Sequence, residues 1–316
     1  MAEPIIGVAI HEATVPETLA VIRRAEELGV AAAWLTTGGV GPDSMTVFAA
    51  AAVQTSRIKL GTAIVPTFPR HPFVVIQQAV ALSQLAPGRF RLGVGPSHKP
   101  TIEGSFGIPF ERPLEHLREY TTILRQALQA GAVDLNGRRF KVHARVANPP
   151  NVPVFISALR PASYELAGEV ADGAISWVTP ASFLRDAARP ALLAGAARRS
   201  DGRTPLLIGH AFAVVSDDAE TGLRTARERL ATYARLPFYQ EMFAAAGFPE
   251  ARQATLSDAL VRGIALFGDE RAVGAGIRRY LDAGLDELIV SLMPVGPDRS
   301  ASIDRTLRAL ATLDGR

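Results

Sequence analysis

Polar side chains follow almost every short apolar run of this sequence. If these runs are parallel β-strands that close into a barrel, the residues after their carboxyl ends converge on one mouth, where barrel enzymes keep their active sites. None of these side chains is redox-active, so electron or hydride chemistry there would need a bound cofactor. The set comprises His11, Thr36, Thr37, Thr67, Arg70, His71, Ser97, His98, Arg160, Trp177 and Thr179.

His98 is the best placed of the histidines. It stands between Pro96 and Pro100, which restrict its backbone. Imidazole titrates near neutral pH, as a group that exchanges protons should. We therefore take His98 as the first candidate catalytic residue and His11 as the second. His71 precedes a proline at the expected start of a helix and is interpreted as a helix-start residue.

The sequence allows more than one role for other polar residues. Thr36 and Thr37 either contact substrate or form hydrogen bonds at the end of a strand. His143 and His210 are interpreted as structural or surface residues.

Several well-known kinds of site are absent from the sequence. It holds no His-Glu-x-x-His pair, no Gly-x-Ser-x-Gly elbow, no Walker loop and no carboxylate pair at strand ends. Residues 93–95 read Gly-Val-Gly, but the third glycine of a dinucleotide fingerprint is missing. Cysteine is absent too, which excludes disulfides, thiolate metal sites and cysteine nucleophiles. We predict no metal site.

The composition is that of an ordinary soluble protein. Of the 316 residues, 48% are hydrophobic and 21% are charged. The net charge is +3, but the arginines are scattered and interspersed with acidic residues, so we expect neither nucleic-acid binding nor a membrane span. The opening MAEPIIGVAI lacks the features of a signal peptide, and a cytoplasmic location is expected.

Strand-like and helix-like runs alternate along the whole chain. Eight strands are predicted over residues 5–10, 31–36, 58–65, 89–94, 152–158, 173–178, 206–215 and 287–292, with helices between them. Apolar strands separated by helices are typical of a parallel sheet. With no linker in view, we predict an α/β fold, a single (β/α)8 TIM-barrel domain spanning residues 1–316.

Insertions into this barrel are predicted after strands 4 and 7, at about residues 99–113, 130–150 and 234–265. Residues 99–113, rich in proline and glycine, predict an irregular loop. Asn136-Gly137 predicts a hairpin over residues 134–143. Residues 236–261 predict extra helical material. Aromatic side chains in these insertions either form an apolar lid or pack in the core: Phe106, Phe110, Phe238, Tyr239 and Phe243.

Several segments in order resemble the bacterial luciferase-like monooxygenase superfamily. They read IKLGTAIVP at 58–66, RHP at 70–72 and GRFRLGVG at 88–95. The run GPSH at 95–98, with later segments through Trp177 and Gly268-Asp269-Glu270, resembles the branch that uses the deazaflavin coenzyme F420. The resemblance implies an eight-stranded barrel, a homodimer, and a cofactor ring in the barrel mouth.

The resemblance also implies positions for the cofactor contacts. A non-proline cis peptide is expected between Ala63 and Ile64, so that these two residues and Val65 lie behind the ring. Ser97 and His98 would face cofactor or substrate. The loop after strand 5 would offer backbone N–H groups to the cofactor phosphate at a helix start. The remaining implied contacts are Ala158, Leu159, Arg160, Pro161 and Trp177.

Two departures from the family pattern bear on function. Many relatives have glycine where this chain has Arg160, so the arginine would either add a phosphate contact or crowd the site. Sugar-dehydrogenase relatives carry an acid–histidine pair where Thr36 and Thr37 stand, which argues against sugar oxidation.

The function implied is hydride transfer between F420 and a small organic substrate, with reduction of an activated C=C or C=N bond. His98, then His11, would supply the proton. The alternatives are an FMN-dependent monooxygenase on the same barrel and a barrel that binds a flavin-like ligand without turnover.

Overall fold

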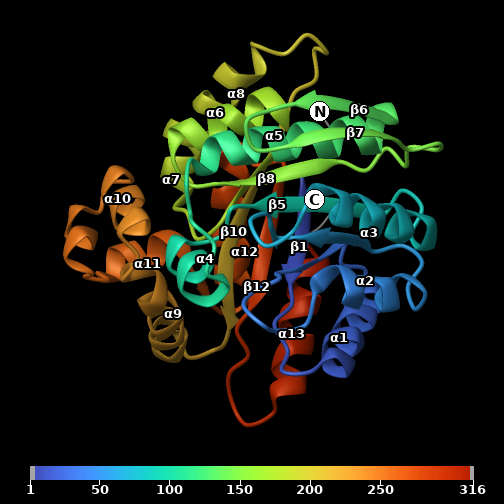
Figure 1. Ribbon diagram of the computed structural model, residues 1–316. Coiled ribbons are helices and arrows are strands. Elements are labelled where there is room, and N and C mark those ends of the chain that lie inside the picture. The colour runs from blue at the N-terminus through green and yellow to red at the C-terminus, as the bar shows by residue number, and fades with distance from the viewer. Residues whose placement is uncertain (1–3, 314–316) are drawn as a thin grey trace.

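A computed structural model describes residues 4–313, so the predicted domain of 1–316 includes six terminal residues that lie outside the described residues. Eight parallel strands close into a barrel, which confirms the (β/α)8 prediction (Figure 1). The last strand pairs with the first and closes the cylinder, with Ile5 opposite Glu287. In order around the barrel the strands are β1 (Ile5–Ala9), β2 (Ala32–Leu35), β3 (Lys59–Thr62) continued by β4 (Val65–Pro66), β5 (Phe90–Gly95), β8 (Val154–Ala158), β9 (Gly173–Ser176), β10 (Leu206–Val215) and β12 (Glu287–Leu292).

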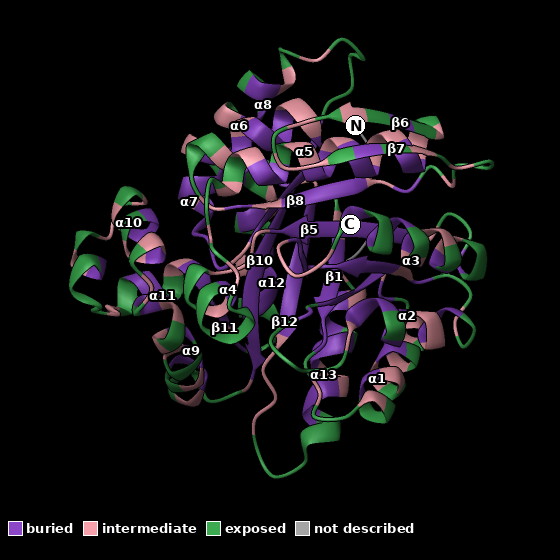
Figure 2. Ribbon diagram, viewed as in Figure 1, coloured by how far each residue is buried: buried purple, intermediate pink, exposed green. Residues whose placement is uncertain are grey.

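Helices surround this barrel and turn their apolar faces toward it. Figure 2 shows buried strands inside and helices that are buried on one side and exposed on the other. A capping box of Thr14 and Glu17 begins the first helix. The helices are α1 (Val15–Leu28), α2 (Ser44–Ala52), α3 (Pro72–Leu85), α5 (Pro113–Arg125) with η1 (Gln126–Ala130), α6 (Pro161–Val170), α7 (Ala181–Phe183) with η2 (Leu184–Ala188) and α8 (Arg189–Ala196), α9 (Ala219–Ala234), α12 (Glu270–Asp282) and α13 (Arg299–Ala311).

Additional elements interrupt the alternation. Between β5 and β8 lie α4 (Lys99–Phe106) and the hairpin of β6 (Ala132–Asn136) and β7 (Lys141–Arg145). Between β10 and β12 lie α10 (Pro237–Ala245), η3 (Pro249–Gln253), α11 (Asp258–Ile264) and the short strand β11 (Leu266–Gly268), which pairs with β10.

The prediction of an irregular loop over residues 99–113 was wrong in its first half, which forms α4. Pro100 sits in the first helical turn, where a missing N–H costs nothing. Gly107, at a φ of 66°, ends the helix in the left-handed conformation that glycine favours. Proline and glycine therefore mark the two ends of a short helix here.

The strand predicted over 58–65 is divided in the structure. A cis peptide bond joins Ala63 to Ile64, as the resemblance implied, and separates β3 from β4. Thr62 Oγ1 donates to the Gly93 carbonyl at 2.8 Å and ties β3 to its neighbour next to this break. The chain thus bulges at the barrel mouth.

The interior of the barrel is filled by side chains and its base is closed. Trp34 lies across the interior, and a Cβ on Gly61 would come 2.4 Å from its ring, so only glycine fits opposite it. The Trp34 indole donates to Glu287 at 2.7 Å, and Arg91 donates to the same carboxylate at 2.5 and 3.0 Å. Glu287 and Arg91 stand near the starts of β12 and β5, so this buried network lies at the end opposite the mouth.

No helix within residues 4–313 has the length and apolar character needed to cross a bilayer. In the same described range, no three or more His, Cys, Asp or Glu side chains gather as a metal site would require.

Candidate active site

A cavity of about 920 Å³ opens at the carboxyl ends of the barrel strands. Most residues singled out in the sequence line it together, although the loops that carry them are far apart along the chain. Val65 and Pro161 are exceptions, since neither borders the cavity. The predicted residues that line it are His11, Thr36, Thr37, Ala63, Ile64, Ser97, His98, Ala158, Leu159, Arg160 and Trp177.

The bulge between β3 and β4 forms one wall of this cavity. Thr36 donates its hydroxyl to the Ala63 carbonyl at 2.7 Å, and the Thr37 N–H donates to the Ile64 carbonyl at 3.2 Å. The Thr37 hydroxyl is bonded to Ser44 at 2.6 Å and accepts from its N–H at the start of α2. Both threonines therefore hold the bulge in place, which favours the strand-end interpretation over substrate contact.

His98 lies at another wall, just before α4. Its ring stacks on Phe238 of α10 at a centroid distance of 5.1 Å and meets the edge of Tyr239. Ser97 has a φ of 62° and turns the chain sharply after β5. Burial lowers the pKa of His98 below its usual 6.5, because charging the ring would cost hydration. Burial therefore favours the neutral form of this ring.

His11 belongs to a chain of hydrogen bonds with a fixed direction. The Val178 N–H donates to His210 Nδ1 at 3.3 Å, so His210 carries its proton on Nε2 and donates to Ser291 at 2.8 Å. The Ser291 hydroxyl then donates to His11 Nε2 at 3.3 Å, which leaves the His11 proton on Nδ1. Within residues 4–313, no protein atom accepts this Nδ1–H.

The His11 ring lines the cavity, so small molecules reach it, but protein surrounds it on its other sides. This burial, together with the positive charge of Arg229, lowers the pKa of His11 to about 4. His11 is therefore a neutral donor at physiological pH. His210 is fully buried, and its pKa is well below the usual value because of burial, which confirms the structural interpretation.

Trp177 is held rigidly at the end of β9. Its indole stacks on His210 at 3.6 Å and meets His11 edge-on at 6.4 Å. The Trp177 Nε1–H donates to the Tyr233 hydroxyl at 2.9 Å. Tyr233 therefore accepts from Trp177, and its own O–H proton remains available to a ligand.

At the start of α6, the backbone N–H groups expected to face a phosphate have other partners. The N–H groups of Leu159 and Arg160 both donate to the Ser163 hydroxyl, at 3.0 and 3.1 Å. Pro161 has no N–H, and the Ser163 N–H bonds to the Arg160 carbonyl. The expectation that this loop offers several N–H groups to a phosphate was therefore wrong: the serine side chain takes them. In the described chain the Ala162 N–H is left without a protein acceptor.

The charged side chains that border the cavity are all cationic. They are Lys99, Arg160 and Arg229, and among the described residues of the lining none is Asp or Glu. Lys99 pairs with Glu103 at 3.9 Å, whereas Arg160 and Arg229 have no carboxylate within ion-pair distance among residues 4–313. Positive charge in a mostly apolar cavity favours an anionic, partly aromatic ligand.

The sequence analysis missed the part of the cavity lining that comes from α9. Arg229 and Tyr233 are one helical turn apart on α9, and neither was among the residues singled out from the sequence. The signal available was this pair of polar residues at a spacing of four, but only the packed fold shows that this face meets the mouth.

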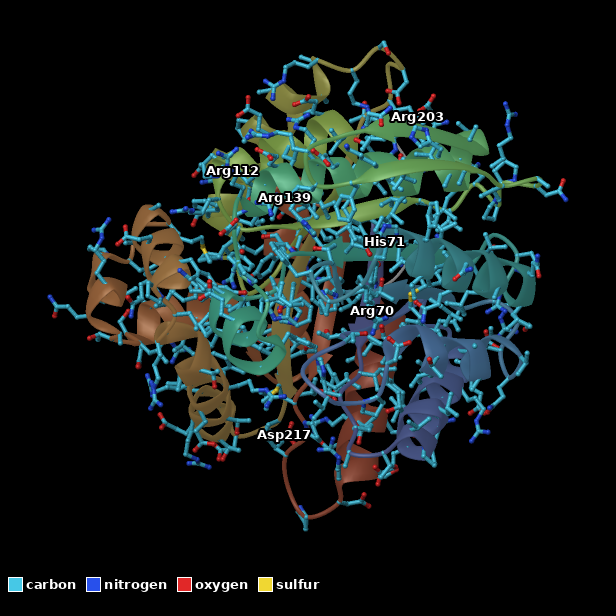
Figure 3. All side chains as sticks on the ribbon, viewed as in Figure 1. Arg70, His71, Arg112, Arg139, Arg203 and Asp217 are labelled. Atoms are coloured by element: carbon cyan, nitrogen blue, oxygen red, sulfur yellow. The ribbon has the colours of Figure 1, made fainter. Side chains whose placement is uncertain are left out.

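Four of the polar residues after predicted strands lie outside the cavity. Thr67 hydrogen-bonds to His116 at 3.0 Å, and Arg70 pairs with Asp43 at 2.6 Å. His71 accepts from the Phe73 N–H as the N-cap of α3, which confirms its helix-start role; Figure 3 labels Arg70 and His71. Thr179 accepts from Ser176 in the core.

The five aromatic residues of the insertions divide between the two predicted roles. Phe110, Phe238 and Tyr239 border the cavity, as a lid would. Phe243 is fully buried in the core, and Phe106 is exposed outside the cavity.

Comparison with known proteins identifies the family. Residues 5–287 match the family model described as luciferase-like monooxygenase, and the chain belongs to this family. An F420-dependent glucose-6-phosphate dehydrogenase of Nocardia farcinica is 32% identical over 295 residues, which cover 88% of this chain and 85% of that protein. A 5,10-methylenetetrahydromethanopterin reductase of Methanopyrus kandleri is 25% identical over 343 residues, covering 96% and 97%.

Solved structures share the fold. The F420-dependent tetrahydromethanopterin reductase from Methanopyrus kandleri superposes with a TM-score of 0.77 at 24% identity, covering 98% of both chains. An F420-dependent secondary alcohol dehydrogenase superposes with a TM-score of 0.81 at 18% identity, covering 99% of both. An FMN-containing Baeyer–Villiger monooxygenase from Pseudomonas putida superposes at 0.74 and 16% identity, covering 100% of this chain and 98% of that one.

Proposed function

We propose that this protein is an oxidoreductase that transfers a hydride between coenzyme F420 and a small organic substrate, with reduction of an activated C=C or C=N bond. The observation that carries the proposal is the charge of the cavity. Its lining is largely apolar, and its charged side chains are all cationic. The Nocardia farcinica relative named as F420-dependent supports the choice of cofactor. We further propose a cytoplasmic homodimer, as the family resemblance implies.

The residues present fit such a cofactor. The bulge at Ala63 and Ile64 offers a flat apolar surface for a ring. Arg160, Lys99 and the Ala162 N–H gather cationic and donor groups for the anionic tail. Arg160 would then add a phosphate contact rather than crowd the site, because its side chain is exposed toward the opening.

The chemistry divides between cofactor and protein. Coenzyme F420, when bound, supplies or accepts a hydride at its deazaflavin ring. Reduction of a double bond also adds one proton to the substrate, and we assign His98 as the group that holds this proton at its imidazole, with His11 as the second candidate. The stack of His98 on Phe238 fixes the ring plane at the cavity wall and excludes water from that face.

Sugar oxidation is not part of the proposal. The acid–histidine pair of sugar dehydrogenases is replaced here by Thr36 and Thr37, whose hydroxyl groups are engaged with Ala63 and Ser44.

Cofactor titration tests the proposal directly. We expect F420 fluorescence to change on binding to the purified protein, and FMN to bind more weakly. Arg160→Met should weaken F420 binding by about tenfold, since it removes a charge-assisted contact. Arg224→Met, on an exposed part of α9 outside the cavity, is the matched control and should bind F420 as the wild type does.

The outcomes separate the alternatives. Tight FMN binding with no F420 binding would favour the FMN-dependent monooxygenase. F420 binding without hydride transfer to a panel of enones and imines would favour the barrel without turnover.

A further inference from the structure

The wall of the cavity formed by α9 has a property that cofactor binding does not use. It presents hydrogen-bond donors and a positive charge from two different elements: Arg229 and Tyr233 from α9, and His11 from the loop after β1. We refer to these three residues as the Arg229 wall.

Within residues 4–313 no carboxylate lies within ion-pair distance of the Arg229 guanidinium, whereas Arg227, two residues earlier, pairs with Asp258. Arg229 borders the cavity and is also exposed, so water screens part of its charge. A guanidinium in this setting has its donors free for a ligand.

The two other members of the Arg229 wall each accept a hydrogen bond from the protein, which leaves their own protons for a ligand. Tyr233 accepts from the Trp177 indole, so its hydroxyl proton is left for another acceptor. His11 accepts at Nε2 from Ser291, so its Nδ1 carries the proton. The charge of Arg229 acts on both rings, since it lowers the pKa of His11 and of the Tyr233 hydroxyl, although burial outweighs it and raises the pKa of Tyr233. Tyr233 lies one helical turn from Arg229, and His11 meets the Trp177 ring that donates to Tyr233, so the three residues line the same part of the cavity.

A site with a cation, two neutral donors and no acid is complementary to an oxyanion. The geometry points to an oxyanion subsite at the Arg229 wall: we propose that the substrate carries a carboxylate or phosphate group that Arg229 pairs with and that His11 and Tyr233 orient. This inference rests on the proposed function for the identity of the reaction, and it adds the class of substrate. It also gives His11 a binding role in place of proton donation.

Binding of small aromatic probes tests the subsite without any turnover. The probes are benzoate, phenyl phosphate and the neutral benzamide, titrated calorimetrically into the protein without cofactor. Arg229→Met should weaken binding of the preferred anion by about tenfold or more and leave benzamide unchanged, because it removes a charge-assisted hydrogen bond. Arg229→Lys should restore part of the loss. Arg224→Met, which removes an exposed arginine of the same helix outside the cavity, is the matched control and should keep the wild-type affinity. Benzoate binding tighter than phenyl phosphate identifies a carboxylate substrate, and the reverse order a phosphate.

A second readout follows the His11 ring by NMR. A bound anion beside Arg229 should raise the pKa of His11 from about 4, and this rise should vanish in Arg229→Met. The subsite is refuted if the wild type binds neither anion, if Arg229→Met binds them as the wild type does, or if Arg224→Met loses as much affinity as Arg229→Met.

Failure of the subsite and failure of the proposed function are distinguishable by F420 titration of the same proteins. We expect Arg229→Met to bind F420 within about twofold of the wild type. If it loses F420 as strongly as Arg160→Met does, Arg229 belongs to the cofactor site and the subsite is rejected. If the wild type binds no F420, the proposed function fails while the anion results stand.

Discussion

The histidines of the cavity are neutral for different reasons. Burial alone lowers the pKa of His98, whereas His11 is affected by burial and also by Arg229. The two rings also differ in their partners, since His98 makes ring contacts and His11 is held by a hydrogen bond from Ser291. His98 is thus freer to exchange a proton with a ligand.

The rate of substrate reduction should rise as the pH falls if His98 donates the proton. Its pKa lies below 6.5, so between pH 8 and 6.5 the charged fraction increases about tenfold per pH unit, and the rate should follow. His98→Ala should lower the rate and remove this dependence, with F420 affinity measured separately. His71→Ala is the control, since His71 caps α3 outside the cavity. An unchanged profile in His98→Ala would exclude His98 as the donor.

Residues after strands could be predicted from the sequence because a strand end is a local feature. His98 and Trp177 were found in this way. Arg229 and Tyr233 could not be, because their helix reaches the mouth only through long-range packing of α9. The occupation of the Leu159 and Arg160 N–H groups by Ser163 was also beyond the sequence, since it depends on one side-chain rotamer.

At the scale of elements, His116 joins three segments. It lies on α5, stacks on Phe68 at 4.1 Å, bonds to Thr67 at 3.0 Å and meets Phe140 of the hairpin. The residue is 6% exposed. Burial, helped by the charge of Arg139, lowers its pKa to about 4.

This shift predicts acid destabilisation. The unfolded chain binds a proton at His116 below pH 6.5, whereas the folded protein does so only near pH 4, so this stabilisation is complete above 6.5 and is lost as the pH falls toward 4. The expected loss at pH 5 is about 2 kcal/mol. Urea unfolding should be measured at pH 7 and at pH 5. The fall in unfolding free energy between these two pH values should be about 2 kcal/mol smaller for His116→Gln than for the wild type. His143→Gln, which removes an exposed histidine of the hairpin and keeps the surroundings of His116, should retain the loss. Equal losses in wild type and His116→Gln would contradict the assignment.

Elements of regular pattern were predictable and irregular ones were not. β10 and β12 have the predicted bounds, because apolar runs flanked by polar residues define them. α4 was missed because Pro100 and Gly107 were interpreted as loop residues, although both are compatible with helix ends.

At the scale of the molecule, barrel closure followed from the number of strands and the helices between them. The position of α10 over the mouth could not be predicted, since it depends on contacts such as Phe238 with His98, 140 residues apart by their numbers.

The network of Arg91, Glu287 and Trp34 closes the base of the barrel. Cofactor and substrate must therefore both enter the cavity through the opening at the mouth. The ligand that sits deeper has to enter first and leave last. We expect steady-state kinetics with an obligatory order of addition, shown by product-inhibition patterns and by isotope trapping of the first ligand. Random addition would mean that a second route exists. If the order is obligatory, the residues that close the base of the barrel determine the order in which the two ligands bind at its mouth.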